Sequence, residues 1–235
     1  MSLSRRHWFM AQCQQDPPPT CKLIPEICEN GIWSFEWCGC VSYPTPILID
    51  VDGDGFNLSS SASGVAFNLN NIGGREKLAW ITLGSDDAWL VLDRNQNGTI
   101  DDGAELFGDV TTQPPLQVGE SKNGFRALAE FDKAANGGNG DGEITQADVV
   151  FSSLRLWQDS NHNGISETAE LRPLFALNVV SLDLDYEVSK RTDRNGNRFN
   201  FRAKVKSDKS GDLGRWAWDV LLVRSLEELE PNIRN

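Results

Sequence analysis

Hydrophobic and polar residues alternate along three stretches in the last third of the chain, residues 180–186, 199–205 and 216–222. A period of two places the apolar side chains on one face of a strand, and one-sided apolar faces are typical of antiparallel sheets. The dipeptide Asn195-Gly196, a strong hairpin signal, separates the first two stretches. The pattern therefore predicts an antiparallel β-meander whose tryptophans and phenylalanines form a core face.

The middle of the chain shows both strand and helix periodicity. Ile47, Ile49 and Val51 alternate as a strand, and residues 89–92 form a second strand-like run. Apolar residues fall at helical spacing in two places, which are Phe125, Leu128 and Ala129, and Leu171, Leu174 and Phe175. The predicted fold class is α+β, with short helices and strands around polar loops, followed by the meander and preceded by a small Cys-rich arm.

Composition divides the chain into a Cys/Pro-rich N-terminal arm at residues 1–45, a module at 46–223 and an acidic tail at 224–235. The arm contains every cysteine of the chain, Cys13, Cys21, Cys28, Cys38 and Cys40. A short segment without a core is usually held by disulfides in an oxidising compartment. Zinc is disfavoured because only Cys38-Gly-Cys40 approaches a CxxC spacing. The odd count leaves one thiol that is either free or paired with a second copy or another extracellular or cell-surface protein.

The chain carries 22 Lys and Arg against 34 Asp and Glu, a net charge of −12, which argues against a nucleic-acid partner. The sequence contains no apolar run of about 18 residues, so we expect no membrane span. Residues 1–11 are basic but lack an apolar core of about 7 to 15 residues, so a signal peptide is not evident. We expect a secreted, extracellular protein.

Short oxygen-bearing side chains stand on alternate residues before a glycine at residues 50–55, 93–98 and 159–164. Ca²⁺ binds about six to eight oxygens, and Asp or Asn at loop positions 1, 3 and 5 supplies them while Gly at position 6 permits a sharp turn. A single cluster of this kind is explained equally well as a solvated turn. Three copies at one spacing favour EF-hand-like calcium loops. Roughly three or four Ca²⁺ ions would cancel more than half of the net charge.

The loops differ in how completely the sequence supplies ligands. The loop at residue 159 has the full set, Asp159, Asn161, Asn163, Ile165, Glu167 and Glu170. The loop at residue 93 needs an extra loop residue or Asp102 to complete it, because Glu105 falls one residue after position 12; its other candidates are Asp93, Asn95, Asn97, Thr99 and Asp101. The loop at residue 50 has no acid at position 12 and needs a distant ligand or water beside Asp50, Asp52 and Asp54. A fourth candidate, with an insertion near its start, comprises Asp132, Asn139, Asp141, Glu143 and Asp148.

Other polar stretches carry less chemistry. Residues 68–73 are interpreted as a turn because Ile72 occupies position 5, and residues 193–197 as the hairpin turn of the meander. The histidines are His7 and His162, and no serine, histidine and aspartate grouping or phosphate-binding glycine loop accompanies them. The sequence therefore indicates no catalytic residues and no cofactor besides Ca²⁺.

From Pro46 to about Val223 the chain resembles the calcium-binding module of bacterial RTX-type secreted proteins. The matching stretches are 46–55, 92–109, 124–130 and 154–164, and the arm before Tyr43 lies outside the resemblance. The best-known member of that family is a self-processing module that cleaves an Asp-Pro bond when calcium binds. The resemblance implies that the aspartate attacks its own carbonyl to form an anhydride, which water or a lysine opens.

Thr45 precedes Pro46 in this chain, and threonine has no carboxylate for that attack. The sequence therefore predicts a calcium-binding structural or interaction module without catalysis, stabilised by several Ca²⁺ ions. Two alternatives stay open. One is a calcium-dependent autoprocessing domain that cleaves an Asp-Pro bond such as Asp16-Pro17. The other is a dockerin-like docking module, against which the wide meander after Leu177 argues.

Overall fold

The computed structural model describes residues 31–34, 39–42, 44–71, 74–117, 120–208 and 215–225. The chain divides into two compact units, Met1–Tyr43 and Pro44–Asn235. In the first unit, β1 (Gly31–Ser34) and β2 (Gly39–Ser42) pair antiparallel. The predicted disulfides and the Asp16-Pro17 bond lie outside the residues whose side chains are described, so both stay predictions.

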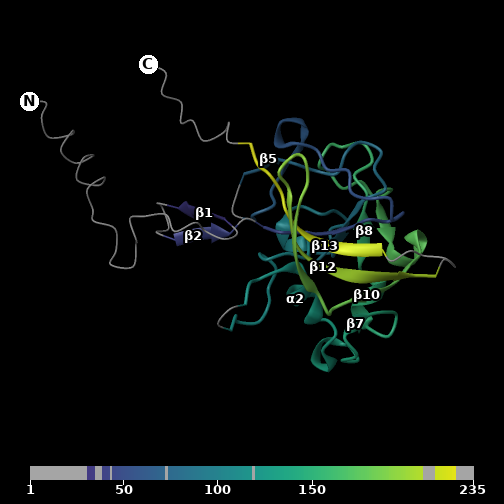
Figure 1. Ribbon diagram of the computed structural model, residues 1–235. Coiled ribbons are helices and arrows are strands. Elements are labelled where there is room, and N and C mark those ends of the chain that lie inside the picture. The colour runs from purple at the N-terminus through teal and green to yellow at the C-terminus, as the bar shows by residue number, and fades with distance from the viewer. Residues whose placement is uncertain are drawn as a thin grey trace, which may run out of the picture. The chain divides into compact units, whose positions relative to one another are not determined.

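Most strands of the second unit form one antiparallel sheet (Figure 1). In the described residues its order is β7-β10-β12-β13-β3-β6-β8-β9, with β11 paired to β12. The bounds are β3 Ile47–Ile49, β6 Ala88–Val91, β7 Glu143–Ile144, β8 Arg155–Trp157, β9 Leu171–Pro173, β10 Val179–Asp183, β11 Glu187–Thr192, β12 Arg198–Ser207 and β13 Arg215–Leu221. A separate ribbon joins β4 (Val65–Phe67) to β5 (Glu76–Leu78).

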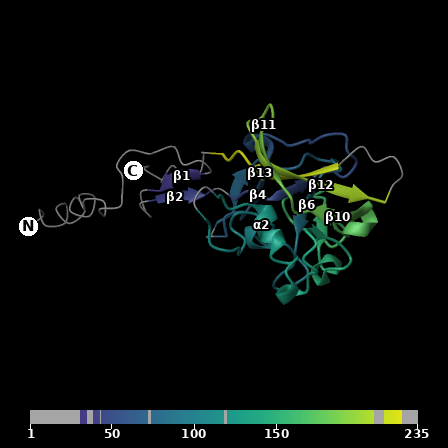
Figure 2. The ribbon, with the colours of Figure 1, turned by 60° about the horizontal axis from the view of Figure 1, so that its bottom comes forward.

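Helical structure is scarce in the second unit. Among the described residues α2 (Gly124–Ala129) is the one α-helix, and the others are 3-10 turns at η1 Ser61–Ser63, η2 Gly103–Glu105, η3 Ala134–Asn136, η4 Val149–Ser152 and η5 Leu174–Leu177. Figures 1 and 2 place α2 and the segments around β7 to one side of β12 and β13. None of the helices in the described ranges has the length and apolar composition to span a bilayer, as the sequence indicated.

The α+β fold class predicted from the sequence is wrong, because the described part of the protein is mostly β. The helical spacing at residues 125–129 does correspond to α2, whose N-cap Asn123 accepts a hydrogen bond from the backbone N–H of Arg126. The spacing at residues 171–175 does not correspond to a helix. Those residues divide between strand β9 and turn η5, because Pro173 lacks the N–H that a helix interior requires and breaks the segment.

The central strands are buried on both faces, which explains their continuous apolar runs. Ile47 and Ile49 of β3 belong to one core cluster, whereas Leu48 belongs to a second cluster on the other face. The same alternation separates Leu90 from Trp89 in β6. The second cluster contains aromatic side chains that pack in tilted and edge-to-face pairs, Phe67, Trp80, Trp89 and Trp157, with neighbouring ring centroids 4.9–5.5 Å apart. Cores on both faces fix the ends of the strands, from which the polar loops emerge.

The predicted meander is present with one correction to its connections. Strands β10, β12 and β13 are neighbours in the sheet, as predicted. The hairpin turn around Asn195-Gly196, however, joins β12 to β11, a strand that the alternation did not reveal. The side chains of β11 are mostly exposed and polar, so this segment lacks the alternation of apolar and polar residues that predicted the other strands. Phe199 and Trp218 lie in the second core cluster, which confirms that these aromatic residues form a core face.

Candidate metal centres

Four loops of the second unit are built around an inward-facing aspartate at position 1. One carboxylate oxygen of each accepts a hydrogen bond of 2.8–3.0 Å from the backbone N–H of the position-6 glycine; the pairs are Asp50 with Gly55, Asp93 with Gly98, Asp132 with Gly142, and Asp159 with Gly164. All four glycines have positive φ, from 69° to 106°, a region that side chains with a Cβ rarely adopt. The sharp turn expected from the glycine spacing is therefore present in each loop.

A second carboxylate closes three of these loops from the opposite end. Glu105, Asp148 and Glu170 are 3%, 2% and 6% exposed. Each accepts a hydrogen bond from a backbone N–H at position 9 of its loop, donated by Asp101, Thr145 and Glu167 at 2.8, 2.7 and 3.4 Å. Each also accepts from position 2 or 3, donated by Asn95, Asn139 and Ser160 at 3.4, 3.2 and 2.9 Å. Two buried carboxylates thus serve each of the loops at residues 132 and 159, and one buried and one half-buried carboxylate serve the loop at residue 93. A hard cation offsets such an arrangement.

The loop at residue 159 contains the most complete set of oxygens. It begins after β8 and ends before β9, so paired strands hold both ends. The amides of Asn161 and Asn163 donate to Oε1 of Glu167 at 3.2 and 2.9 Å, and these hydrogen bonds, that of Asn163 first, hold the pKa of Glu167 below its usual value. The second oxygen of Glu167, Oε2, is buried and has no hydrogen-bond partner among the described residues. A buried oxygen without a hydrogen-bond partner is available to bind a cation.

In the loop at residue 93, the structure assigns the closing position to Glu105. Asp102, the other candidate, instead caps η2, where Oδ1 accepts from the N–H of Ala104 at 2.8 Å. The remaining acid, Asp101, accepts from the amides of Asn97 and Asn95, which lower its pKa. An extra residue before Glu105 is therefore accommodated within the loop.

The loops at residues 93 and 159 are joined to each other at position 8. The backbone N–H of Ile100 donates to Oγ of Ser166 at 2.6 Å, and both residues are buried. This contact explains why a serine replaces the usual apolar residue at position 8 of the second of these loops. The contact therefore links the backbone of one loop to a side chain of the other.

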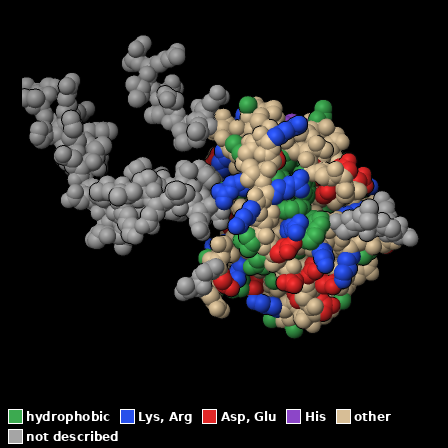
Figure 3. Space-filling view, viewed as in Figure 1, with side chains coloured by type: hydrophobic (Ala, Val, Ile, Leu, Met, Phe, Trp, Pro, Cys, Tyr) green, Lys and Arg blue, Asp and Glu red, His purple; other side chains and the backbone are tan. Residues whose placement is uncertain are grey.

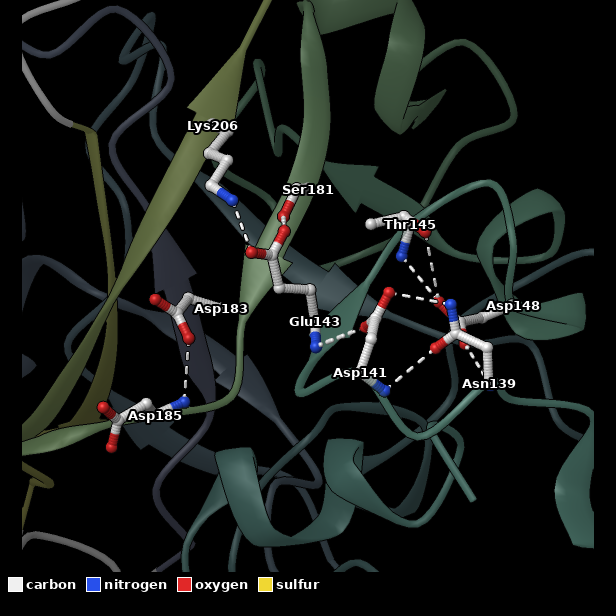
Figure 4. Close-up of polar contacts among 9 residues, drawn as sticks. All are labelled: Asn139, Asp141, Glu143, Thr145, Asp148, Ser181, Asp183, Asp185 and Lys206. Carbon is white, nitrogen blue, oxygen red and sulfur yellow. Dashed lines mark hydrogen bonds and ion pairs between the residues drawn. The ribbon is translucent and has the colours of Figure 1, made fainter. Parts of the chain in front are cut away.

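The fourth loop carries its insertion as a 3-10 turn, η3, between Asp132 and Asn139. Figure 4 shows Asn139, Asp141 and Asp148 gathered on one side, with the amide of Asn139 donating to Asp141 at 2.7 Å. Glu143 turns the other way. Its carboxylate accepts from Oγ of Ser181 at 2.5 Å and forms an ion pair with Lys206, the interaction that most lowers its pKa (Figure 4). Since Glu143 stands at position 7, where the ligand is the backbone carbonyl, its side chain is free to do so.

The first loop differs because no acid within it closes it. Asp52 and Asp54 are exposed, and the backbone N–H of Asp52 donates instead to Oδ2 of Asp86 at 2.7 Å. Sequence reasoning missed Asp86 and its neighbour Asp87, which directly precede strand β6. The available signal was a pair of acids ahead of a predicted strand, although the distance of 34 residues along the chain concealed the connection.

Charge on the visible face follows these loops. In the space-filling view, acidic side chains gather over the lower half of the second unit, where β7 and β10 lie, among scattered Lys and Arg (Figure 3). The loops contribute exposed Asp and Asn at their middle positions, while Asp50, Asp132 and Asp159 at position 1 and the closing acids Glu105, Asp148 and Glu170 are buried. This division is what a site open to solvent at one end requires.

A family model for the SPM domain matches residues 47–221, well over half of the chain. The chain therefore belongs to the SPM domain family. It is also similar to the iron-regulated protein FrpA of Neisseria meningitidis serogroup C, with 41% identity over 205 residues that cover 81% of this chain. The match spans 17% of that relative, so this chain corresponds to less than a fifth of its length.

Proposed function

We propose that this chain is a secreted calcium-binding structural or interaction module, whose fold is stabilised by several Ca²⁺ ions and which carries out no catalysis. The observation that supports it most is the repeated pair of acids at the two ends of a loop, in which every acid except the half-buried Asp93 is buried. Asp93 with Glu105, Asp132 with Asp148, and Asp159 with Glu170 each face one loop from its two ends. Withdrawing two like charges of one loop from water is unfavourable unless a cation offsets them.

The donor chemistry of these loops supports calcium in particular. All candidate ligands are carboxylate, amide or carbonyl oxygens, and Ca²⁺ prefers oxygens in a flexible arrangement of six to eight ligands. Several positions carry Asn where a stronger site would carry Asp. We therefore expect weak affinity, with dissociation constants on the order of 10⁻⁴ to 10⁻³ M, as in extracellular modules.

Two observations favour a non-catalytic module. Thr45 stands before Pro46, so a carboxylate for anhydride formation is not available at that bond. The ring of His162 is held between two backbone carbonyls, with Nδ1 2.6 Å from the oxygen of Ile81 and Nε2 2.8 Å from that of Ser63. Both ring nitrogens therefore serve the attachment of the loop to the rest of the fold. The autoprocessing alternative retains Asp16-Pro17, and the docking alternative must accommodate the large sheet behind the loops.

The test compares calcium-stripped protein with protein in millimolar Ca²⁺, following the melting temperature and the intact mass together. We expect Ca²⁺ to raise the melting temperature, because ions that bind only the folded state stabilise it, and to leave the mass unchanged. An equal concentration of Mg²⁺ serves as the control for ionic strength. A melt that is the same with chelator and with Ca²⁺ would refute the proposal, and a calcium-dependent fragment would favour autoprocessing.

A further inference from the structure

The first loop is brought against a second acidic segment by strand pairing. Strands β3 and β6 are antiparallel, with Ile49 opposite Ala88. Asp50 follows Ile49 and Asp87 precedes Ala88, so the register sets the two aspartates beside each other at one end of the strand pair. Asp86 joins them, and one carboxylate oxygen from each of the three lies within 4.8 Å of the others.

Asp87 supplies an independent observation that a ligand belongs here. Its side chain is 0% exposed. Oδ2 accepts hydrogen bonds from the N–H of Asn57 at 2.8 Å and from Oγ of Ser85 at 2.7 Å. Oδ1 is buried and has no hydrogen-bond partner among the described residues. A buried carboxylate oxygen left without a partner is costly, and a proton or a cation is needed to offset it.

The surroundings of Asp87 favour a bound cation over an ionised carboxylate that has no positive charge beside it. The carboxylates of Asp50, Asp86 and Asp87 bring like charges within 4.8 Å of one another, and that of Asp87 is fully buried. A divalent cation among the three carboxylates would offset both this repulsion and the cost of burying Asp87.

The position of Asp86 matches that of the closing acids in the other loops. Glu105 and Asp148 accept from the backbone N–H at position 3 of their loops, and Asp86 accepts from the N–H of Asp52, which is position 3 of the first loop. Asp86 therefore stands where the missing position-12 acid would stand. It reaches that place through the fold and not through the local sequence.

We propose that Asp50, Asp86 and Asp87 form a Ca²⁺ site that closes the first loop and ties it to the start of β6. The exposed side chains of Asp52 and Asp54, together with water, complete the shell of oxygens that Ca²⁺ requires. The inference rests on the proposed function for the identity of the ion. It adds a site whose ligands come from two segments of the chain and whose occupancy links the two strands at their ends.

The test counts the Ca²⁺ ions bound per chain by native mass spectrometry, for the full chain and for Asp86→Asn. Asp86 is half-buried, and an amide oxygen can still accept from the N–H of Asp52, so this change preserves the local hydrogen bond. We expect the variant to bind one ion fewer than the unmodified protein at the same free Ca²⁺. Asp185→Asn is the matched control, since it removes one negative charge from an exposed carboxylate outside the four loops and should leave the count unchanged.

The outcomes separate this inference from the proposed function. If the unmodified chain binds no Ca²⁺, the proposed function fails. If the unmodified chain binds Ca²⁺ and Asp86→Asn binds as many ions equally tightly, the site at Asp86 alone is disproved. A second measurement avoids mutation altogether: in an NMR titration with Ca²⁺, the amide resonances of Asp52, Gly55 and Asn57 should shift together. If these resonances stay fixed while those of Gly98 and Gly164 move, the site is also disproved.

Discussion

The hydroxyl of Thr45 donates a hydrogen bond of 2.9 Å to Oδ2 of Asp219, in an interior where the two residues are 2% and 0% exposed. The same oxygen accepts from the backbone N–H of Gly124 at 2.8 Å, and the N–H of Thr45 bonds to Asp109. Thr45 thus contacts two buried carboxyl groups, those of Asp109 and Asp219, which come from distant parts of the chain. The bond between Thr45 and Pro46 is held firmly at the start of β3.

This arrangement allows the absence of self-cleavage to be tested directly. We expect the Thr45-Pro46 bond to remain intact after a day in millimolar Ca²⁺, because a hydroxyl at this position cannot form the anhydride. Thr45→Asp should introduce slow cleavage that yields a fragment beginning at Pro46, measured by intact mass. Thr45→Ser, which keeps the hydroxyl, should remain whole. A fragment starting at Pro46 from the unmodified chain would overturn the expectation, and one starting at Pro17 would instead support cleavage at Asp16-Pro17.

The buried carboxyl of Asp219 should make stability depend on pH. Burial raises the pKa of Asp219 well above 3.8 and that of Asp109 to about 6. A carboxyl group with a raised folded pKa is more protonated in the folded state, so its contribution to the free energy of unfolding falls as pH rises above about 4. Asp219→Asn removes this loss while its amide oxygen can still accept from Thr45 and Gly124.

Urea unfolding in saturating Ca²⁺ at pH 4.5 and pH 7 measures the effect. The stability of Asp219→Asn relative to the unmodified protein should increase from pH 4.5 to pH 7, because only the unmodified protein must ionise a buried carboxyl group as the pH rises. A relative stability that is the same at both pH values would show that Asp219 titrates normally.

Glu170 should dominate calcium binding at the loop of residue 159. Its carboxylate accepts hydrogen bonds from both ends of the loop, and the indole Nε1 of Trp157 lies 3.4 Å from Oε2. Excitation of Trp157 can therefore sensitise a bound terbium ion. We expect Glu170→Gln to weaken terbium binding at this site strongly, because the change removes a charged, two-oxygen ligand. Asn68→Ala should leave the titration unchanged. Equal titrations for the unmodified protein and Glu170→Gln would refute this order of importance.

The fourth loop provides a matched pair of acids with opposite expectations. Asp148 faces the loop, whereas the carboxylate of Glu143 faces Ser181 and Lys206. Asp148→Asn should remove one Ca²⁺ from the count per chain. Glu143→Gln should leave the number of bound ions unchanged. It should remove only the charge of Glu143 from its exposed ion pair with Lys206, which contributes about 1 kcal/mol or less to the free energy of unfolding. If Glu143→Gln removed an ion and Asp148→Asn did not, the side chain of Glu143 would be the ligand.

The sequence by itself determined the features that depend on neighbouring residues. Asp at position 1 and Gly at position 6 predicted the sharp turns of the loops at residues 50, 93 and 159, because a carboxylate can accept from a backbone N–H five residues away only when the chain turns sharply, and glycine permits that turn. The loop at residue 132 makes the same contact across its insertion, ten residues away. The strand assignments around Ile49 and Trp89 succeeded for a similar reason, since apolar runs of that length indicate buried strands.

Only the tertiary structure decided which acids complete the loops. Asp86 and Asp87 reach the first loop because β3 and β6 pair with Ile49 opposite Ala88, and a register between distant segments is not encoded in either segment alone. Glu143 turns outward because β10 and β12 bring Ser181 and Lys206 to it. The helix predicted at Leu171 and Leu174 is not formed. Pairing with β8 makes Leu171–Pro173 the strand β9, although the spacing of these residues fits a helix equally well, and Leu174 begins the 3-10 turn η5.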